Sequence, residues 1–284
     1  ERLGKKLNSE FARLTNDFGW ANKTQPLGAT HAYLNPYWSG AATTFSDSQS
    51  SDLESAASSS WWFETRNLLI YKYVKASQNH GYLWDIGSGP GVVSSYLEQQ
   101  GIPCVAVEPS RRGVLASAAR GVHSIESDLA SLQLPGASVD QVGLFDVLEH
   151  IEHRADLLRE IWRVLSPDGV LILTVPALNL LWSSADENAG HFIRYSKRSI
   201  RKELVESGFQ IERSQYFFAS LVLPLLLLRA VPYRLKIKQP VNDKTLLDAN
   251  GGSLGKLVQY FEVGLSRFFS LGTSLIVVAK RVEG

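Results

Sequence analysis

The sequence predicts a doubly wound α/β domain, in which helices cover both faces of a mostly parallel sheet. An apolar segment at 82–86 reads as a buried strand and leads directly into a glycine-rich turn at 87–91. Strand-like and helix-like segments then alternate from residue 92 to residue 218. A final strand-like segment at 273–279 follows an insertion of about 50 residues, which is too long for a simple hairpin.

The turn after the first strand indicates a small-molecule site. Gly87, Gly89 and Gly91 recur at every second position, and glycine lets a ligand approach the main chain without a Cβ in the way. The helix expected at 92–100 directs its free N–H groups at the turn. Dinucleotide sites use the spacing G-x-G-x-x-G. Here the spacing is G-x-G-x-G and Asp85 precedes it, which suits a nucleotide-like ligand carrying an ammonium group. A tight turn without a ligand is the alternative.

Composition limits the partners. The chain has 284 residues, 44% hydrophobic and 20% charged, enough for one large domain or one domain with appendages. A net charge of +1 gives no general argument for nucleic-acid binding, and none is expected. The single Cys104 cannot form an internal disulfide, which fits a reducing compartment. With no apolar stretch of about 18 residues and no recognisable signal peptide, we expect a cytoplasmic protein.

Two regions outside the alternating pattern are assigned separately. Residues 1–60 are expected to be an N-terminal lid or extension, partly mobile, because 43–60 is rich in Ser, Ala, Thr and Asp. The aromatic cluster at 33–38 either packs on the main domain or covers the ligand. Residues 61–284 are expected to form the main domain, interrupted by an insertion at 219–271.

Charged side chains recur around the predicted site. Arg66, in an amphipathic helix that begins with the aromatic residues 61–63, is a candidate partner for a ligand carboxylate, or forms an exposed salt bridge. Glu108 ends the second expected strand about 20 residues beyond the glycines, where such folds place an acid on a ribose diol. A charge at the start of the helix 111–120 is the alternative for Glu108.

The carboxyl end of the fourth expected strand, 139–145, is polar. It continues through Asp146, Glu149 and His150, and ligands bind at this edge of open α/β sheets. His150 is a candidate general base, because an unperturbed imidazole titrates near neutral pH. A role in shaping the pocket is the alternative.

The loop 176–195 after the fifth strand, 170–175, concentrates reactive side chains, as functional loops often do. His191 is the first candidate for a base that deprotonates an acceptor hydroxyl. Arg194 is a candidate contact for an anionic acceptor. The alternative is that these groups only stabilise the loop. The predicted substrate-binding residues are Trp182, Asp186, Arg194 and Tyr195.

These motifs, in this order, resemble the class I S-adenosylmethionine (SAM) methyltransferases over residues 61–218, and the D-E…G-H…R-Y-S segment at 186–196 is similar to a type 11-like bacterial subgroup. The resemblance implies a Rossmann-like seven-stranded sheet of order 3-2-1-4-5-7-6, with the last strand antiparallel. It also implies SAM as the cofactor. The implied cofactor contacts are Asp85, Gly87, Ser88, Gly89 and Gly91 for the amino-acid part, Glu108 for the ribose, Asp128 and Leu129 for the adenine, and Phe145 and Arg66. A helix cap is the alternative for Asp128.

The expected activity is methyl transfer, O-methylation favoured, to a small-molecule or lipid-like envelope-precursor acceptor, with His191 and His150 as catalytic candidates. No metal-ligand cluster stands at a credible spacing, so a metal-free mechanism is expected. A non-catalytic SAM-binding assembly or regulatory protein is the alternative. An apolar run beside basic residues at 219–238 predicts peripheral membrane contact, a lipid pocket, a homodimer contact or a buried helix.

Overall fold

A single nine-stranded sheet organises the computed structural model, which describes residues 25–26, 32–35, 38, 61–77, 81–237, 259, 261–264 and 269–282. Its strands lie in the order β1-β2-β5-β4-β3-β6-β7-β9-β8. The part of this order from β5 to β8, which is β5-β4-β3-β6-β7-β9-β8, is the predicted order 3-2-1-4-5-7-6, which is therefore confirmed. The strands are β1 (Gln25–Pro26), β2 (Ala32–Leu34), β3 (Leu83–Ile86), β4 (Cys104–Glu108), β5 (His123–Glu126), β6 (Val139–Phe145), β7 (Leu165–Pro176), β8 (Phe209–Phe217) and β9 (Ser274–Arg281).

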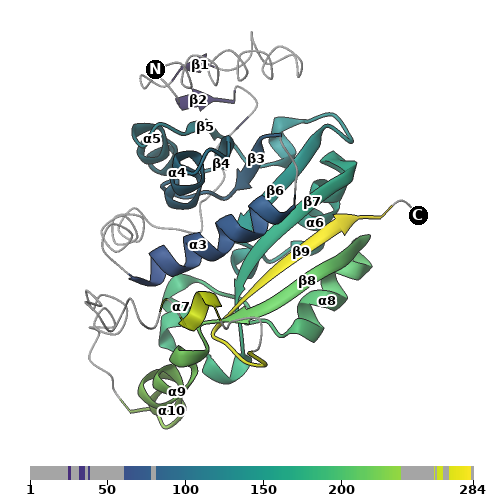
Figure 1. Ribbon diagram of the computed structural model, residues 1–284. Coiled ribbons are helices and arrows are strands. Elements are labelled where there is room, and N and C mark those ends of the chain that lie inside the picture. The colour runs from purple at the N-terminus through teal and green to yellow at the C-terminus, as the bar shows by residue number, and fades with distance from the viewer. Residues whose placement is uncertain are drawn as a thin grey trace.

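Helices cover both faces of the sheet (Figure 1). Successive strand residues alternate between two hydrophobic cores, as the period of two in a strand requires: Val105 packs in the core that includes α6 and α8, and Ala106 in the core that includes α3 and α4. This two-sided burial explains why the central strands read as nearly continuous apolar runs. The helices are α3 (Trp61–Ala76), α4 (Val92–Gln99), α5 (Arg111–Ala119), α6 (Arg154–Val164), α7 (Ser184–Ala189) and α8 (Lys197–Glu206).

The last strand is inserted between two earlier ones. In Figure 1 β9, in yellow, runs between β7 and β8. It pairs antiparallel with both: Val277 lies opposite Leu173 of β7 and opposite Ser214 of β8. The predicted antiparallel placement of this strand is confirmed.

At the opposite edge the sheet is longer than predicted. β2 pairs in parallel with β5, and β1 pairs antiparallel with β2. Asn35, just beyond β2, is buried and donates to Ser127 Oγ at 3.0 Å and to the carbonyl of Ser131 at 2.9 Å. The described part of 1–60 thus extends the sheet edge. The remainder of the predicted lid lies outside the described residues.

The register of β7 against β6 shifts near the start of β7: Leu165 pairs with Val139, and regular pairing resumes with Val170 opposite Gln141. One local expectation is wrong. The segment 176–195, expected to be a loop, contains the turn η3 (Asn179–Leu181) and the helix α7. Ser183 and Asp186 form a capping box at the start of α7, a local signal that was available in the sequence.

The insertion after β8 begins with four short helical segments. They are η4 (Ala219–Leu221), α9 (Val222–Leu225), η5 (Leu226–Ala230), which is a π-helix, and α10 (Val231–Arg234). The buried carboxylate of Glu262 accepts hydrogen bonds from the backbone N–H groups of Ala219 and Ser220 at 3.2 and 2.9 Å. Most of 238–268 lies outside the described residues. Among the helices that the structure describes, none has the length and apolarity needed to cross a membrane.

Candidate functional site

A cavity of about 350 Å³ opens at the carboxyl ends of the central strands. It lies where the strand order reverses, between β3 and β6, which is the usual ligand position in open α/β sheets. Its volume is in the range of small-molecule pockets. The predicted site residues that line it are Arg66, Asp85, Gly87, Ser88, Gly89, Glu108, Phe145, His150, His191 and Arg194.

The three glycines of the turn have different roles. All three have positive φ, between 54° and 72°. A Cβ on Gly91 would lie 2.2 Å from Ser117 Oγ, so this glycine allows α5 to pack closely, and it does not line the cavity. A Cβ on Gly89 would meet nothing within 4 Å. Gly89 lines the cavity, so its bare main chain is open to a ligand.

Asp85 is almost fully buried beneath the turn and accepts a hydrogen bond from the Ser94 hydroxyl. Burial raises the pKa of Asp85 to about 6, although the bond from Ser94 and the charge of Arg66 act in the opposite direction. Ser88, between the first two glycines, has a buried hydroxyl with no hydrogen-bond partner among the described residues. A ligand with polar groups at this end of the cavity would satisfy that hydroxyl.

Glu108 at the end of β4 is held rigidly. Its Oε2 accepts from the N–H of Gly89 and its Oε1 from the N–H of Ser110, each at 2.8 Å. Burial raises the pKa of Glu108, and the two N–H bonds oppose that rise. Each carboxylate oxygen keeps a further lone pair. The side chain can therefore accept two ligand hydroxyls while it fixes the turn.

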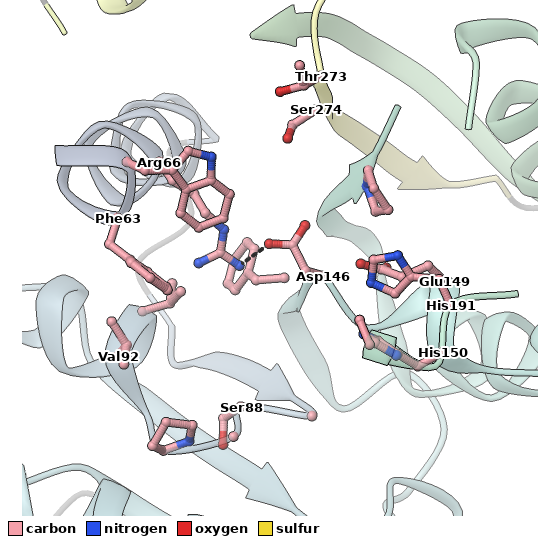
Figure 2. Close-up of a pocket in the computed structure, with 18 of the residues that line it drawn as sticks. Phe63, Arg66, Ser88, Val92, Asp146, Glu149, His150, His191, Thr273 and Ser274 are labelled. Carbon is pink, nitrogen blue, oxygen red and sulfur yellow. Dashed lines mark ion pairs between the residues drawn. The ribbon is translucent and has the colours of Figure 1, made fainter. Parts of the chain in front are cut away.

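Arg66 of α3 forms an ion pair inside the cavity. Its Nη2 lies 2.6 Å from Oδ2 of Asp146, directly after β6, and Figure 2 shows this pair between the two sides of the cavity. Asp146 has a left-handed φ of 58°, a conformation that Asp tolerates better than most residues. The Nε of Arg66 is buried with no partner among the described residues. The exposed salt bridge, one alternative for Arg66, is wrong, because only 6% of its side chain is exposed.

His191 is oriented by a buried carboxylate. Its Nδ1 lies 2.9 Å from Oδ1 of Asp186, and Arg194 Nε donates to the same oxygen at 2.6 Å. Burial opposes ionisation of Asp186, but these bonds from His191 and Arg194 hold its pKa below the ordinary value. Asp186 itself does not line the cavity. It positions His191 and leaves Nε2 of the imidazole for a ligand.

Glu149 and His150 stand beside His191. Figure 2 shows the three on one side of the cavity, opposite Phe63 and Val92. The rings of His150 and His191 lie edge to face with centroids 4.8 Å apart. Burial, and then the charge of Asp146, raise the pKa of Glu149 well above its ordinary value. Burial, and then His191, lower the pKa of His150 to about 4, which makes His150 a poor proton acceptor at neutral pH.

An apolar wall completes the cavity. Trp62 and Phe63 come from α3, whereas Leu221 and Leu225 come from the insertion. Trp62 stacks on Phe218 with a ring separation of 5.4 Å, which joins the two elements. Lining a pocket was one of four alternatives for the insertion. Which of its residues reach the cavity depends on tertiary contacts that no local pattern shows.

Four of the remaining predicted residues lie away from the cavity. Asp128 accepts from the Ser131 N–H at 2.6 Å, the capping alternative, and Leu129 is a core residue. Tyr195 is completely buried and its hydroxyl donates to Glu203 at 3.2 Å. Trp182 is hydrogen-bonded to Tyr233. Contacts between Tyr195 or Trp182 and an acceptor would require rearrangement of these groups.

Comparison with known proteins identifies the family. A family model described as a methyltransferase domain matches residues 51–214. This is more than half of the chain, and the chain belongs to that family. The predictions of a SAM methyltransferase and of SAM as its cofactor are confirmed.

Individual relatives are more distant. A malonyl-[acyl-carrier protein] O-methyltransferase from Enterobacter lignolyticus is 27% identical over 149 residues, 49% of this chain and 57% of the relative. A demethylmenaquinone methyltransferase from Protochlamydia amoebophila is 28% identical over 190 residues, which cover 54% of this chain and 78% of the relative. The chain thus spans little more than half of the first of these relatives.

A solved structure supports the fold. Phosphoethanolamine N-methyltransferase 2 from Haemonchus contortus, in complex with phosphomonomethylethanolamine and S-adenosylhomocysteine, superposes with a TM-score of 0.54 at 18% identity. The match covers 85% of this chain and 59% of that one. At this identity the likeness shows the shared fold alone.

Proposed function

We propose that the protein transfers the methyl group of SAM to an oxygen atom of a small-molecule or lipid-like acceptor. One observation carries the proposal: a single cavity joins the glycine turn and Glu108 to an imidazole, His191, that a buried carboxylate orients. The first part suits an adenosyl donor with hydroxyl and ammonium groups. The second part suits removal of a proton from an acceptor hydroxyl.

In the proposed reaction the protein mainly aligns two reactants, because the sulfonium methyl of SAM is already activated. The acceptor oxygen forms a bond to the methyl carbon as the carbon–sulfur bond breaks. The electron pair of that bond stays on sulfur and gives S-adenosylhomocysteine. The hydroxyl proton passes to Nε2 of His191, and Asp186 stabilises the imidazolium through Nδ1.

The wall of the cavity supports an acceptor with an apolar body and an anionic group. Trp62, Phe63, Leu221 and Leu225 offer apolar surface, and Arg229 lies among the lining residues. The names of two relatives fit such a range, because one acts on malonyl-[acyl-carrier protein] and the other on demethylmenaquinone.

Peripheral membrane contact is part of this proposal. The segment 219–237 exposes Leu223, Leu227, Leu228 and Leu235, each with more than half of its surface accessible. Basic residues follow in the same segment. An apolar surface with neighbouring cations suits an anionic bilayer, and it would bring a lipid-like acceptor close to the cavity.

The test is a methyl-transfer screen with tritiated SAM over cell extracts. The parent is compared with His191→Ala and with a control, His153→Ala, whose histidine is exposed. We expect a labelled product from the parent and the control and at least about 100-fold less from His191→Ala. Calorimetry with SAM is run in parallel. Absence of binding at about millimolar SAM would refute the proposal, whereas normal binding with no labelled product from any extract would favour a non-catalytic SAM-binding protein.

A further inference from the structure

We propose that Glu149, His150 and His191 form a binding site for a divalent transition-metal cation. Each side chain offers one ligand atom, and these atoms all lie within 4.8 Å of one another. Glu149 and His150 follow β6, whereas His191 follows α7, so the two histidines meet only in the folded chain. The sequence showed no cluster at a credible spacing, because 41 residues separate them.

The separation of the ligand atoms is close to that of a loaded site. Ligands at about 2.0–2.2 Å from one ion lie roughly 3.3–3.6 Å apart at the tetrahedral angle. The widest pair here, at no more than 4.8 Å, therefore exceeds a tetrahedral site by at most about 1.5 Å. Small side-chain rotations, without movement of β6 or α7, would close this gap.

The carboxylate of Glu149 provides independent support. Only 1% of this residue is exposed, it lines the cavity, and its Oε2 has no hydrogen-bond partner among the residues that the structure describes. A buried carboxylate oxygen without a partner is costly. Asp146 on the same wall differs, because its carboxylate is paired with Arg66 at 2.6 Å. A cation would give Glu149 the partner that Asp146 already has.

Both imidazoles are held as metal-binding histidines usually are. Nδ1 of His191 lies 2.9 Å from a carboxylate oxygen of Asp186. The ring of His150 is hydrogen-bonded to the backbone of Ala189 and Gly190. In metal sites such bonds to the second ring nitrogen fix the tautomer and the ring orientation.

The donor set identifies the class of cation. Two imidazoles and one carboxylate suit Zn²⁺, Fe²⁺ or Co²⁺, whereas Mg²⁺ and Ca²⁺ prefer oxygen ligands throughout. Three protein ligands leave a coordination position open towards the cavity. This site deepens the proposed function, and only its catalytic role rests on that function. Nε2 of His191 would then be a ligand instead of a base, and the cation would lower the pKa of an acceptor hydroxyl bound to it, so that the hydroxyl proton would leave to solvent.

The test uses Co²⁺ as a spectroscopic probe on the full chain, after removal of bound metals with a chelator. Visible absorption during titration gives the stoichiometry and the dissociation constant. The variants are Glu149→Gln and His191→Ala, and the matched controls are Glu152→Gln and His153→Asn, which replace exposed residues close in sequence. Thermal unfolding and SAM binding are measured for each protein. His191→Ala keeps the test decisive if the buried substitution at Glu149 prevents folding.

We expect one equivalent of Co²⁺ bound by the parent and the controls, unchanged by excess Mg²⁺. Loss of a residue that supports a metal ligand weakens metal binding by about 10–100-fold. Loss of a ligand itself should weaken Co²⁺ binding by more than this. Absence of saturable binding up to about 1 mM Co²⁺, unchanged affinity in both folded variants, or displacement by Mg²⁺ would overturn the proposed site. SAM binding and methyl transfer by the parent separate the two proposals. Failure of the cation site leaves both of these activities intact, whereas failure of the proposed function removes at least one of them.

Discussion

Replacement of Glu108 by Gln should separate the cofactor contact from the fold. Its two oxygens each accept one backbone N–H at 2.8 Å, from Gly89 and Ser110. An amide keeps only one oxygen, so one buried N–H loses its acceptor. This should cost about 1–3 kcal/mol of folding free energy. For a domain of this size the melting temperature should fall by about 2–10 °C.

The same change removes an acceptor from the proposed ribose contact. A hydrogen bond to a charged group contributes about 1.5–3 kcal/mol, so the dissociation constant for SAM should rise by about 10–150-fold. Calorimetry with SAM measures this. S-adenosylhomocysteine that lacks the 2′-hydroxyl should bind the parent more weakly than unmodified S-adenosylhomocysteine does. Its dissociation constant should also change less when Glu108 is replaced by Gln.

A matched control lies on the next strand. Glu126 of β5 is the register partner of Glu108, is similarly buried and pairs with Arg111 at 2.9 Å. It does not line the cavity. Glu126→Gln should therefore leave SAM binding unchanged. A folded Glu108→Gln protein that binds SAM as tightly as the parent would refute the ribose assignment.

Three further predictions concern the same cavity. The pKa of Asp85 is raised from 3.8 to about 6, so its carboxyl stabilises the fold below about pH 4 and this stability is lost as the pH rises to about 6. The free energy of unfolding of Asp85→Asn, relative to that of the parent, should thus rise by on the order of 3 kcal/mol between pH 4 and 6. Above about pH 6 the difference should stay constant, as measured by denaturation at several pH values. Gly91→Ala, with its Cβ 2.2 Å from a side chain of α5, should lose about 2–5 kcal/mol of stability, whereas Gly89→Ala should lose about 1–2 kcal/mol and mainly weaken SAM binding; equal melting temperatures would contradict this. Asp186→Asn should reduce methyl transfer by at least about 10-fold with SAM affinity unchanged, because His191 loses the negative charge that stabilises its imidazolium through Nδ1.

The sequence is informative wherever the signal is local. The turn after β3 was predicted because three glycines, an acid and a following helix stand within a few residues. The strand order followed from resemblance to a family rather than from physical reasoning. The capping role of Asp186 had a local signal, the Ser183–Asp186 spacing, but the chemistry of its neighbours suggested a substrate contact instead.

Other features of the site depend on distant contacts. The side-by-side imidazoles of His150 and His191 arise because the residues at and after the end of α7 bond to the turn Leu148–His150, which follows β6. Tyr195 was predicted to bind substrate because of its neighbours in sequence, yet it is fully buried. The two leucines that the insertion places in the cavity, Leu221 and Leu225, come from an apolar run whose direction only the fold determines.

The position of β9 has a consequence for the order in which the pocket can be built. Thr273 and Ser274, at the start of this strand, line the cavity, and β8 pairs with β9 rather than with β7. During synthesis the glycine turn and Glu108, which are proposed to hold SAM, leave the ribosome long before Thr273 and Ser274. A nascent chain that has reached β8 therefore has the glycine turn but lacks part of the opposite wall, and a deletion of 274–281 would leave β7 and β8 without their shared partner.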